Sequence, residues 1–192
     1  MLLFFTLAVM GAAAYAAARE GLLTAITSLV NVVISGLVAF NFFEPIANEL
    51  EELLRGSFLA GFEDAIALFA PFAATLAALR VLTINLANTD LELPALLQQV
   101  GSGAIALLTG YLVAGFLVVV FQTLPWGDTF LGFDYSATAN TPKARNLMPP
   151  DRVWLAMMSR AGAMPLSQED SVTFDPEGSF EIRYGRLRRF KE

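Results

Sequence analysis

The chain has 192 residues, of which 56% are hydrophobic and only 16% are charged, against about 25% charged residues in soluble domains. It contains no cysteine and no histidine, which excludes disulfides, thiolate metal sites and catalytic arrangements built on histidine. The net charge of −6 argues against nucleic acid as a partner, because surfaces that bind nucleic acid are basic.

Four segments are nearly free of charge and approach the length of a membrane-spanning helix. Residues 1–18, 22–43 and 100–124 contain no Asp, Glu, Lys or Arg, and residues 65–87 contain only Arg80. A hydrocarbon core about 30 Å thick needs roughly 20 apolar helical residues, and a charge at its centre costs several kcal/mol. The sequence therefore predicts an all-α integral membrane protein, with a four-helix transmembrane bundle over residues 1–124.

The first segment is rich in alanine. A secretory signal peptide is the alternative interpretation, but Arg19, the first basic residue, follows the apolar stretch instead of preceding it. We therefore expect a retained helix. Its residues Ala8, Ala12 and Ala16 either form a ridge for close helix packing or only reflect the helix propensity of alanine. The short connection at residues 19–21 predicts an antiparallel hairpin with the second helix.

The second segment contains Asn31, which we expect to hydrogen-bond a neighbouring helix. The connection that follows, residues 44–64, is strongly acidic. Within it, residues 45–54 place apolar side chains on one side of a helix and carboxylates on the other. This pattern predicts a short amphipathic helix along the membrane surface. The pair Glu63 and Asp64 is expected to be solvated, since no histidine is present to complete an acid–base or metal site.

The third segment contains Pro71, which is expected to bend its helix, and Arg80. Two interpretations of Arg80 stay open. Its side chain either reaches the nearer membrane interface, which its position about two turns from the end of the segment favours, or it pairs inside the bundle and lines a conduction path.

The fourth helix is expected to begin within residues 96–103 and to end near Leu124. It has the smallest side chains in the protein. Ala106, Gly110 and Ala114 form a groove in which another helix fits closely. We expect this helix at the centre of the bundle or at a contact with a partner helix.

Residues 125–192 form a polar tail, which contains nine of the twelve Lys and Arg residues. Asp151 is placed to cap a helix that ends near Gly162. Its apolar stripe predicts an amphipathic helix that packs either on the tail or at the membrane interface; the stripe consists of Trp154, Met157, Met158 and Ala161. Two alternating segments, 171–174 and 179–185, predict a β-hairpin. The tail is thus a small α+β unit.

These features together resemble the colicin V production protein family, which consists of small bacterial inner-membrane proteins with four predicted helices. The resemblance rests on the hairpin turn at residues 19–21, on the second segment, and on Gly101 and Gly110 of the fourth helix. It covers about residues 1–124. The chain differs from the family pattern at Thr109, where the family usually has arginine, and it lacks an early acidic residue in the first helix.

The resemblance implies a non-enzymatic protein of the inner membrane, needed for colicin V production or export and for envelope maintenance. It would act as a helical scaffold, with no catalytic residue, metal or cofactor. The alternative is a channel or transporter subunit in which the fourth helix and Arg80 line a path. Expected partners are membrane lipid and either a second copy of the chain or other membrane proteins. The positions of Arg19 and Arg80 favour a cytoplasmic first turn and both termini outside.

Overall fold

The computed structural model describes residues 2–17, 21–87, 94–124, 129–130, 133–134 and 150–162. These residues are almost entirely helical, as the sequence predicts. Their helices and their single antiparallel pair of two-residue strands are α1 (Leu2–Ala17), α2 (Leu22–Leu54), α3 (Glu63–Ala87), α4 (Ala95–Thr123), β1 (Thr129–Phe130), β2 (Phe133–Asp134) and α5 (Pro150–Gly162). The hairpin predicted at residues 171–185 lies outside the described residues.

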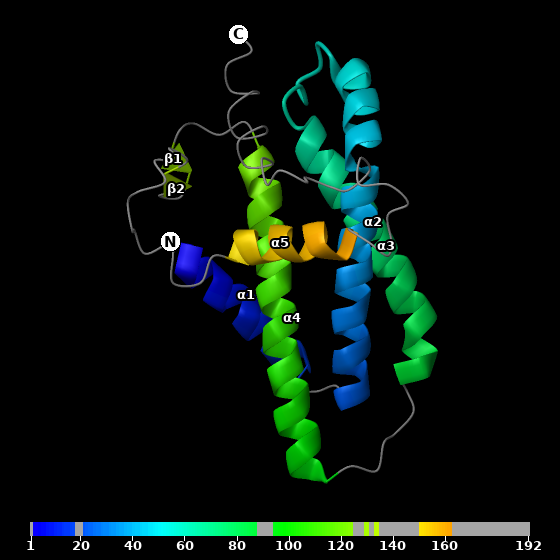
Figure 1. Ribbon diagram of the computed structural model, residues 1–192, viewed down its shortest axis with the longest axis vertical. Helices are drawn as coiled ribbons and strands as arrows, with labels where there is room; N and C mark the ends of the chain where they lie inside the picture. Colours follow the sequence, from blue (N-terminus) through cyan, green and yellow to red (C-terminus); the bar gives the residue numbers. More distant parts are fainter. Residues whose placement is uncertain are drawn as a thin grey trace.

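The long helices α2, α3 and α4 run alongside one another, while α1 lies obliquely against α4 and α5 crosses α2 and α4 steeply (Figure 1). Two contacts fix how the long helices are aligned. Near the start of α2, a side chain at Gly21 would lie 3.3 Å from the Gln98 amide of α4. Further along, Phe72 of α3 stacks on Phe116 of α4 with ring centroids 3.9 Å apart.

Three helical segments of the described chain are long and apolar enough to cross a membrane: α2, residues Glu63–Ile84 of α3, and residues Gln98–Thr123 of α4. This finding agrees with a membrane protein. The fourth expected crossing is not confirmed, because α1 has 16 residues. At 1.5 Å per residue it is about 24 Å long, which is less than the roughly 30 Å of a hydrocarbon core.

The prediction of a separate surface helix at residues 45–54 is wrong, because α2 continues through Pro45 as one helix of 33 residues. Its buried stripe is unbroken: Phe43 and Ala47 are fully or nearly buried, and Leu50 packs against the same core. Proline removes one backbone hydrogen bond from a helix interior. The side chains packed beyond Pro45 offset that loss and hold the helix together.

The prediction that Glu63 and Asp64 are solvated is also wrong. Both lie in the first turn of α3 and are buried, with exposed fractions of 5% and 0%. The Gly61 backbone N–H donates a hydrogen bond of 2.7 Å to Glu63 Oε2. Carboxylates are favoured at this end of a helix, because its free N–H groups and its dipole are positive there.

Candidate functional site

The helix α5 is the amphipathic helix that the sequence predicts. Pro150 occupies its first position, where a missing N–H costs little. Asp151 lies in the first turn and Arg160 in the last turn, and the helix dipole favours a negative charge at the first and a positive charge at the last. Trp154 and Met158 are buried, with exposed fractions of 0% and 1%. The residues on the other side of the helix, including Arg160, are exposed.

Two glycines allow α5 to approach the long helices closely, and together we call them the glycine notch: Gly36 of α2 and Gly115 of α4. A Cβ added at Gly36 would lie 2.5 Å from the Trp154 ring. A Cβ at Gly115 would collide with the Pro150 carbonyl oxygen and lie 3.0 Å from the Trp154 Cβ. Real Cβ atoms do not approach other atoms this closely, so α5 occupies this place only because both positions lack a side chain.

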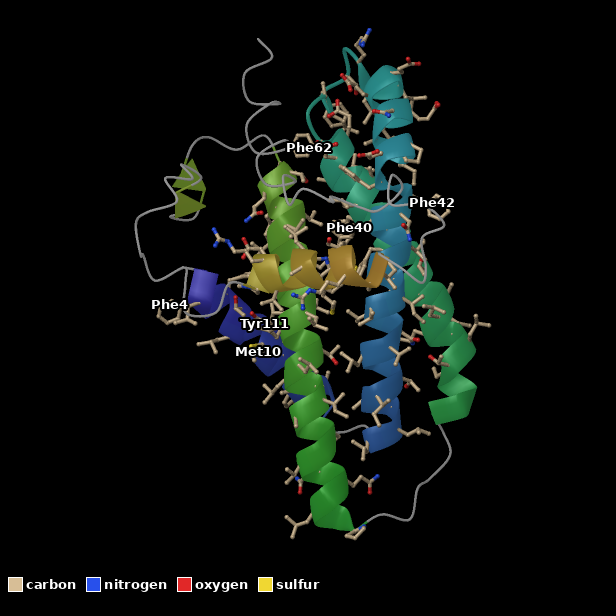
Figure 2. The ribbon with its side chains drawn as sticks, in the orientation of Figure 1. Phe4, Met10, Phe40, Phe42, Phe62 and Tyr111 are labelled. Carbon is tan, nitrogen blue, oxygen red and sulfur yellow. The ribbon has the colours of Figure 1, made fainter. Side chains whose placement is uncertain are left out.

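The indole of Trp154 lies in an aromatic cluster supplied by all three long helices. Its ring centroid is 6.4 Å from that of Phe40 on α2, 6.4 Å from that of Phe72 on α3 and 5.6 Å from that of Phe116 on α4. The last two pairs are edge-to-face, a geometry that aromatic rings prefer. Phe40 is labelled beside α5 in Figure 2. Trp154 therefore connects the three candidate spans at one point.

Polar groups are buried beside this contact. The Gln122 side-chain amide of α4 donates a hydrogen bond of 2.9 Å to Asp151 Oδ2, and both residues are buried. The Trp154 Nε1–H has no hydrogen-bond partner among the residues that the structure describes. No group of three or more acidic side chains in the described part of the chain is placed to hold a metal ion. The arrangement of these side chains joins α5 to the long helices.

The sequence predicts a groove at Ala106, Gly110 and Ala114. At Gly110, the middle residue of this groove, α1 of the same chain occupies the space. A Cβ added at Gly110 would lie 2.8 Å from the Met10 Cα and 2.8 Å from the Ala13 Cβ. Ala106 and Ala114 are buried as well, with exposed fractions of 3% and 0%. Figure 2 shows Met10 on α1 near Tyr111 of α4, where the two helices cross.

Arg80 lies on the exposed side of α3, whose main neighbour is α2. The structure does not bring it together with the groove residues of α4. One turn further along α3, Thr83 Oγ1 accepts a hydrogen bond of 2.9 Å from Asn31 Nδ2 of α2. This confirms the prediction that Asn31 bonds a neighbouring helix.

Sequence reasoning found the apolar stripe of α5 but not the surface that receives it. Gly36 lies between Ser35 and Leu37 in a mostly apolar segment, and no local pattern relates it to Gly115, which lies 79 positions later. The signal that points to them is an apolar stripe centred on a tryptophan, since a ring of that size needs a recess, and glycines in long helices provide one.

A known protein family matches the part of the chain that contains most of these helices. The sequence model of the family described as Colicin V production protein matches residues 4–140, which is more than half of the 192 residues. The chain belongs to the colicin V production protein family. The matched region begins within α1, includes α2, α3, α4 and both strands, and ends before α5 begins. No curated protein and no solved structure gives a significant match.

Proposed function

We propose that this family member supports colicin V production as a helical scaffold of the bacterial inner membrane, without catalysing a reaction. Family membership supports the role in colicin V production. The observation that carries the scaffold is the position of Trp154, which contacts aromatic rings of α2, α3 and α4 at once. Because α5 is joined to three other helices at one residue, the relative positions of these helices are fixed. Fixed positions favour the role of a scaffold on which partners assemble.

Complementation of a colicin V producer strain tests the proposal. The strain's own member of the family is deleted, this chain is supplied in its place, and the zone of growth inhibition around the colony is measured. We expect the zone to be restored. A chain that is present in the membrane at normal amounts and does not restore the zone would contradict the role, and toxin retained inside the cells would locate the defect at export rather than synthesis.

The scaffold function requires partners, and we propose that these are membrane lipid together with either a second copy of the chain or other membrane proteins. Crosslinking in intact membranes followed by affinity purification identifies them. Recovery of one protein in a fixed ratio supports the scaffold. A chain that crosslinks to nothing while colicin V production is intact argues against it.

The channel or transporter alternative gains no specific support from the described side chains. Gly110 is covered by α1 and Gly115 by α5, while Arg80 lies apart from both on α3. Ion or solute flux into liposomes that contain the purified chain provides the test. We expect no flux above that of empty liposomes. Flux that Arg80→Ala abolishes would favour the channel.

We propose that the end of the bundle that carries the α2–α3 connection and the start of α1 face the outside of the inner membrane. Acidic residues gather at this end, among them Glu44, Glu63 and Asp64. Basic residues are retained on the cytoplasmic side, which places Arg19 there. A periplasm-dependent phosphatase fused after Glu192 should be active. A cytoplasmic fluorescent reporter that is bright at the same position would reverse the orientation.

A further inference from the structure

The two helices that carry the glycine notch span one apolar layer with polar residues at both ends. At a rise of 1.5 Å per residue, α2 covers about 33 Å from Leu22 to Glu44, and α4 covers about 36 Å from Gln98 to Gln122. The contact between Gly21 and Gln98 aligns the two layers at one end. A single slab, slightly thicker than a hydrocarbon core of about 30 Å, therefore fits both helices.

The notch lies inside this slab, near one edge. Gly36 precedes Glu44 by eight residues, and Gly115 precedes Gln122 by seven, so α5 crosses about 10–12 Å from the polar ends of α2 and α4. An amphipathic helix at an interface buries its apolar face about 5–10 Å into the boundary between headgroups and acyl chains. The depth of α5 thus corresponds to the boundary between headgroups and acyl chains.

Two arginines face outward at this depth. Arg152 and Arg160 are exposed, and eight residues of helix separate them by about 12 Å. Neither forms an ion pair with another described residue. The acidic residue of α5, Asp151, is turned inward and buried against Gln122. A guanidinium at the edge of the acyl region extends to the headgroup level, where it is solvated or pairs with an anion. The lipid phosphates are the anions of the membrane at that level.

We propose that α5 is an interfacial helix whose outer face binds the headgroups of anionic phospholipids through Arg152 and Arg160. Guanidinium groups suit this ligand because their donors form paired hydrogen bonds to phosphate oxygens. The inner face of α5 is held by the glycine notch and the aromatic cluster, so the arginines are presented by a fixed helix. The proposal concerns a segment beyond the matched part of the family, and it does not depend on the role in colicin V production.

The first experiment measures the depth of α5. Because the chain has no cysteine, a single Ala156→Cys substitution on the exposed side of α5 takes one nitroxide label. Labels at Ala74 on the exposed side of α3, near the middle of the slab, and at Leu53 near the end of α2 serve as references. Accessibility to oxygen and to a water-soluble nickel chelate should place the Ala156 label between the two references. A value equal to that at Leu53 would mean that α5 lies in water, which overturns the proposal.

The second experiment measures lipid preference on the full chain. The protein is equilibrated with mixed phosphatidylglycerol and phosphatidylcholine, and the ratio of retained lipids is read by native mass spectrometry. Removing one arginine should lower the preference for phosphatidylglycerol by roughly two- to fivefold, so R152Q/R160Q should lose most of it. R152K/R160K keeps both charges but loses the paired hydrogen bonds of the guanidinium groups, so it should retain part of the preference and lie between the parent and R152Q/R160Q.

The matched control is R55Q, which removes one exposed charge outside the slab. It should leave the preference unchanged. An equal loss in R55Q would assign the preference to net charge, and an unchanged preference in R152Q/R160Q would show that α5 binds no headgroup; either result overturns the proposal.

Discussion

Single residues decide where α5 docks. Gly36 and Gly115 lie on different helices, and each meets a different part of α5: Gly36 meets the Trp154 ring, whereas Gly115 meets the backbone at Pro150. A side chain can rotate away from a new methyl group, but a backbone moves only with its whole helix. The α4 half of the notch is therefore the less tolerant one.

Gly115→Ala is expected to displace α5. The added methyl group collides with the Pro150 carbonyl, and overfilling a packed contact costs about 1–3 kcal/mol. Trp126→Phe leaves Trp154 as the only tryptophan, so its fluorescence reports on docking, and we expect the emission of Gly115→Ala to shift to longer wavelength.

Gly103→Ala, on the same helix, provides the control for this substitution. Nothing lies within 4 Å of its added Cβ, so the docking should be unchanged and α4 should gain about 0.5–1 kcal/mol. Identical spectra for the two variants would show that Gly115 is not required for α5 to dock.

At the scale of elements, the contact between α2 and α3 includes a hydrogen bond in an apolar surrounding. Asn31 donates to Thr83, whose hydroxyl in turn donates to the Leu79 carbonyl over 2.7 Å. Such bonds between membrane helices are weaker than a water-free setting implies, because the separated helices also find partners.

A double-mutant cycle measures this bond. Asn31→Leu and Thr83→Val each remove one partner, and the coupling between them should be about 0.6 kcal/mol and below about 2 kcal/mol. The free energy of unfolding in mixed micelles supplies the four values of the cycle. Additive losses, with no coupling, would mean that the hydrogen bond adds nothing to the α2–α3 contact.

Because α2 continues through Pro45 as one helix, we expect a substitution of this proline to stabilise the chain. Pro45→Ala restores a backbone donor inside a helix, and the interior penalty of proline is about 3 kcal/mol. We expect the variant to be more stable than the parent by up to about that amount, measured by the same unfolding assay. A helix that began anew at Pro45 would show no gain, because proline is tolerated at the first helical position.

The sequence was informative wherever local pattern decides the outcome. The helices, the stripe of α5 and the bonding of Asn31 follow from apolar periodicity and from the cost of an unpaired amide in lipid. The extension of α2 past Pro45 and the burial of Asp64 do not, because both depend on residues that pack from another helix. The glycine notch is not local either, since its two halves are brought together only by the fold.

At the scale of the whole molecule, packing has to substitute for the hydrophobic effect. Lipid chains are as apolar as leucine, so helices in a membrane associate through close approach and polar contacts. This chain uses glycine at three crossings: Gly110 where α1 meets α4, Gly115 where α5 meets α4, and Gly36 where α5 meets α2. Gly110 and Gly115 are close together on α4, but Gly110 packs against α1 and Gly115 against α5. A substitution at one of them should therefore disrupt one contact and leave the other intact.

Gly110→Leu is expected to detach α1 and to leave α5 in place. The leucine side chain would enter the space of the Met10 Cα and the Val9 carbonyl, which are backbone atoms of α1. Phe5 and Phe121, whose ring centroids are 5.7 Å apart, mark the same contact. Cysteines at these two positions, joined by a short thiol crosslinker, should react in the parent chain and lose most of that reaction in Gly110→Leu.

Gly103→Leu makes the same change on α4 where nothing lies within 4 Å, and it should preserve the crosslink. Trp154 emission should be the same in all three chains, because α5 docks through other residues. If Gly110→Leu instead keeps the crosslink within the chain while crosslinks between copies disappear, the groove of α4 is a contact between molecules. That outcome would assign to self-association the surface that α1 covers in the structure.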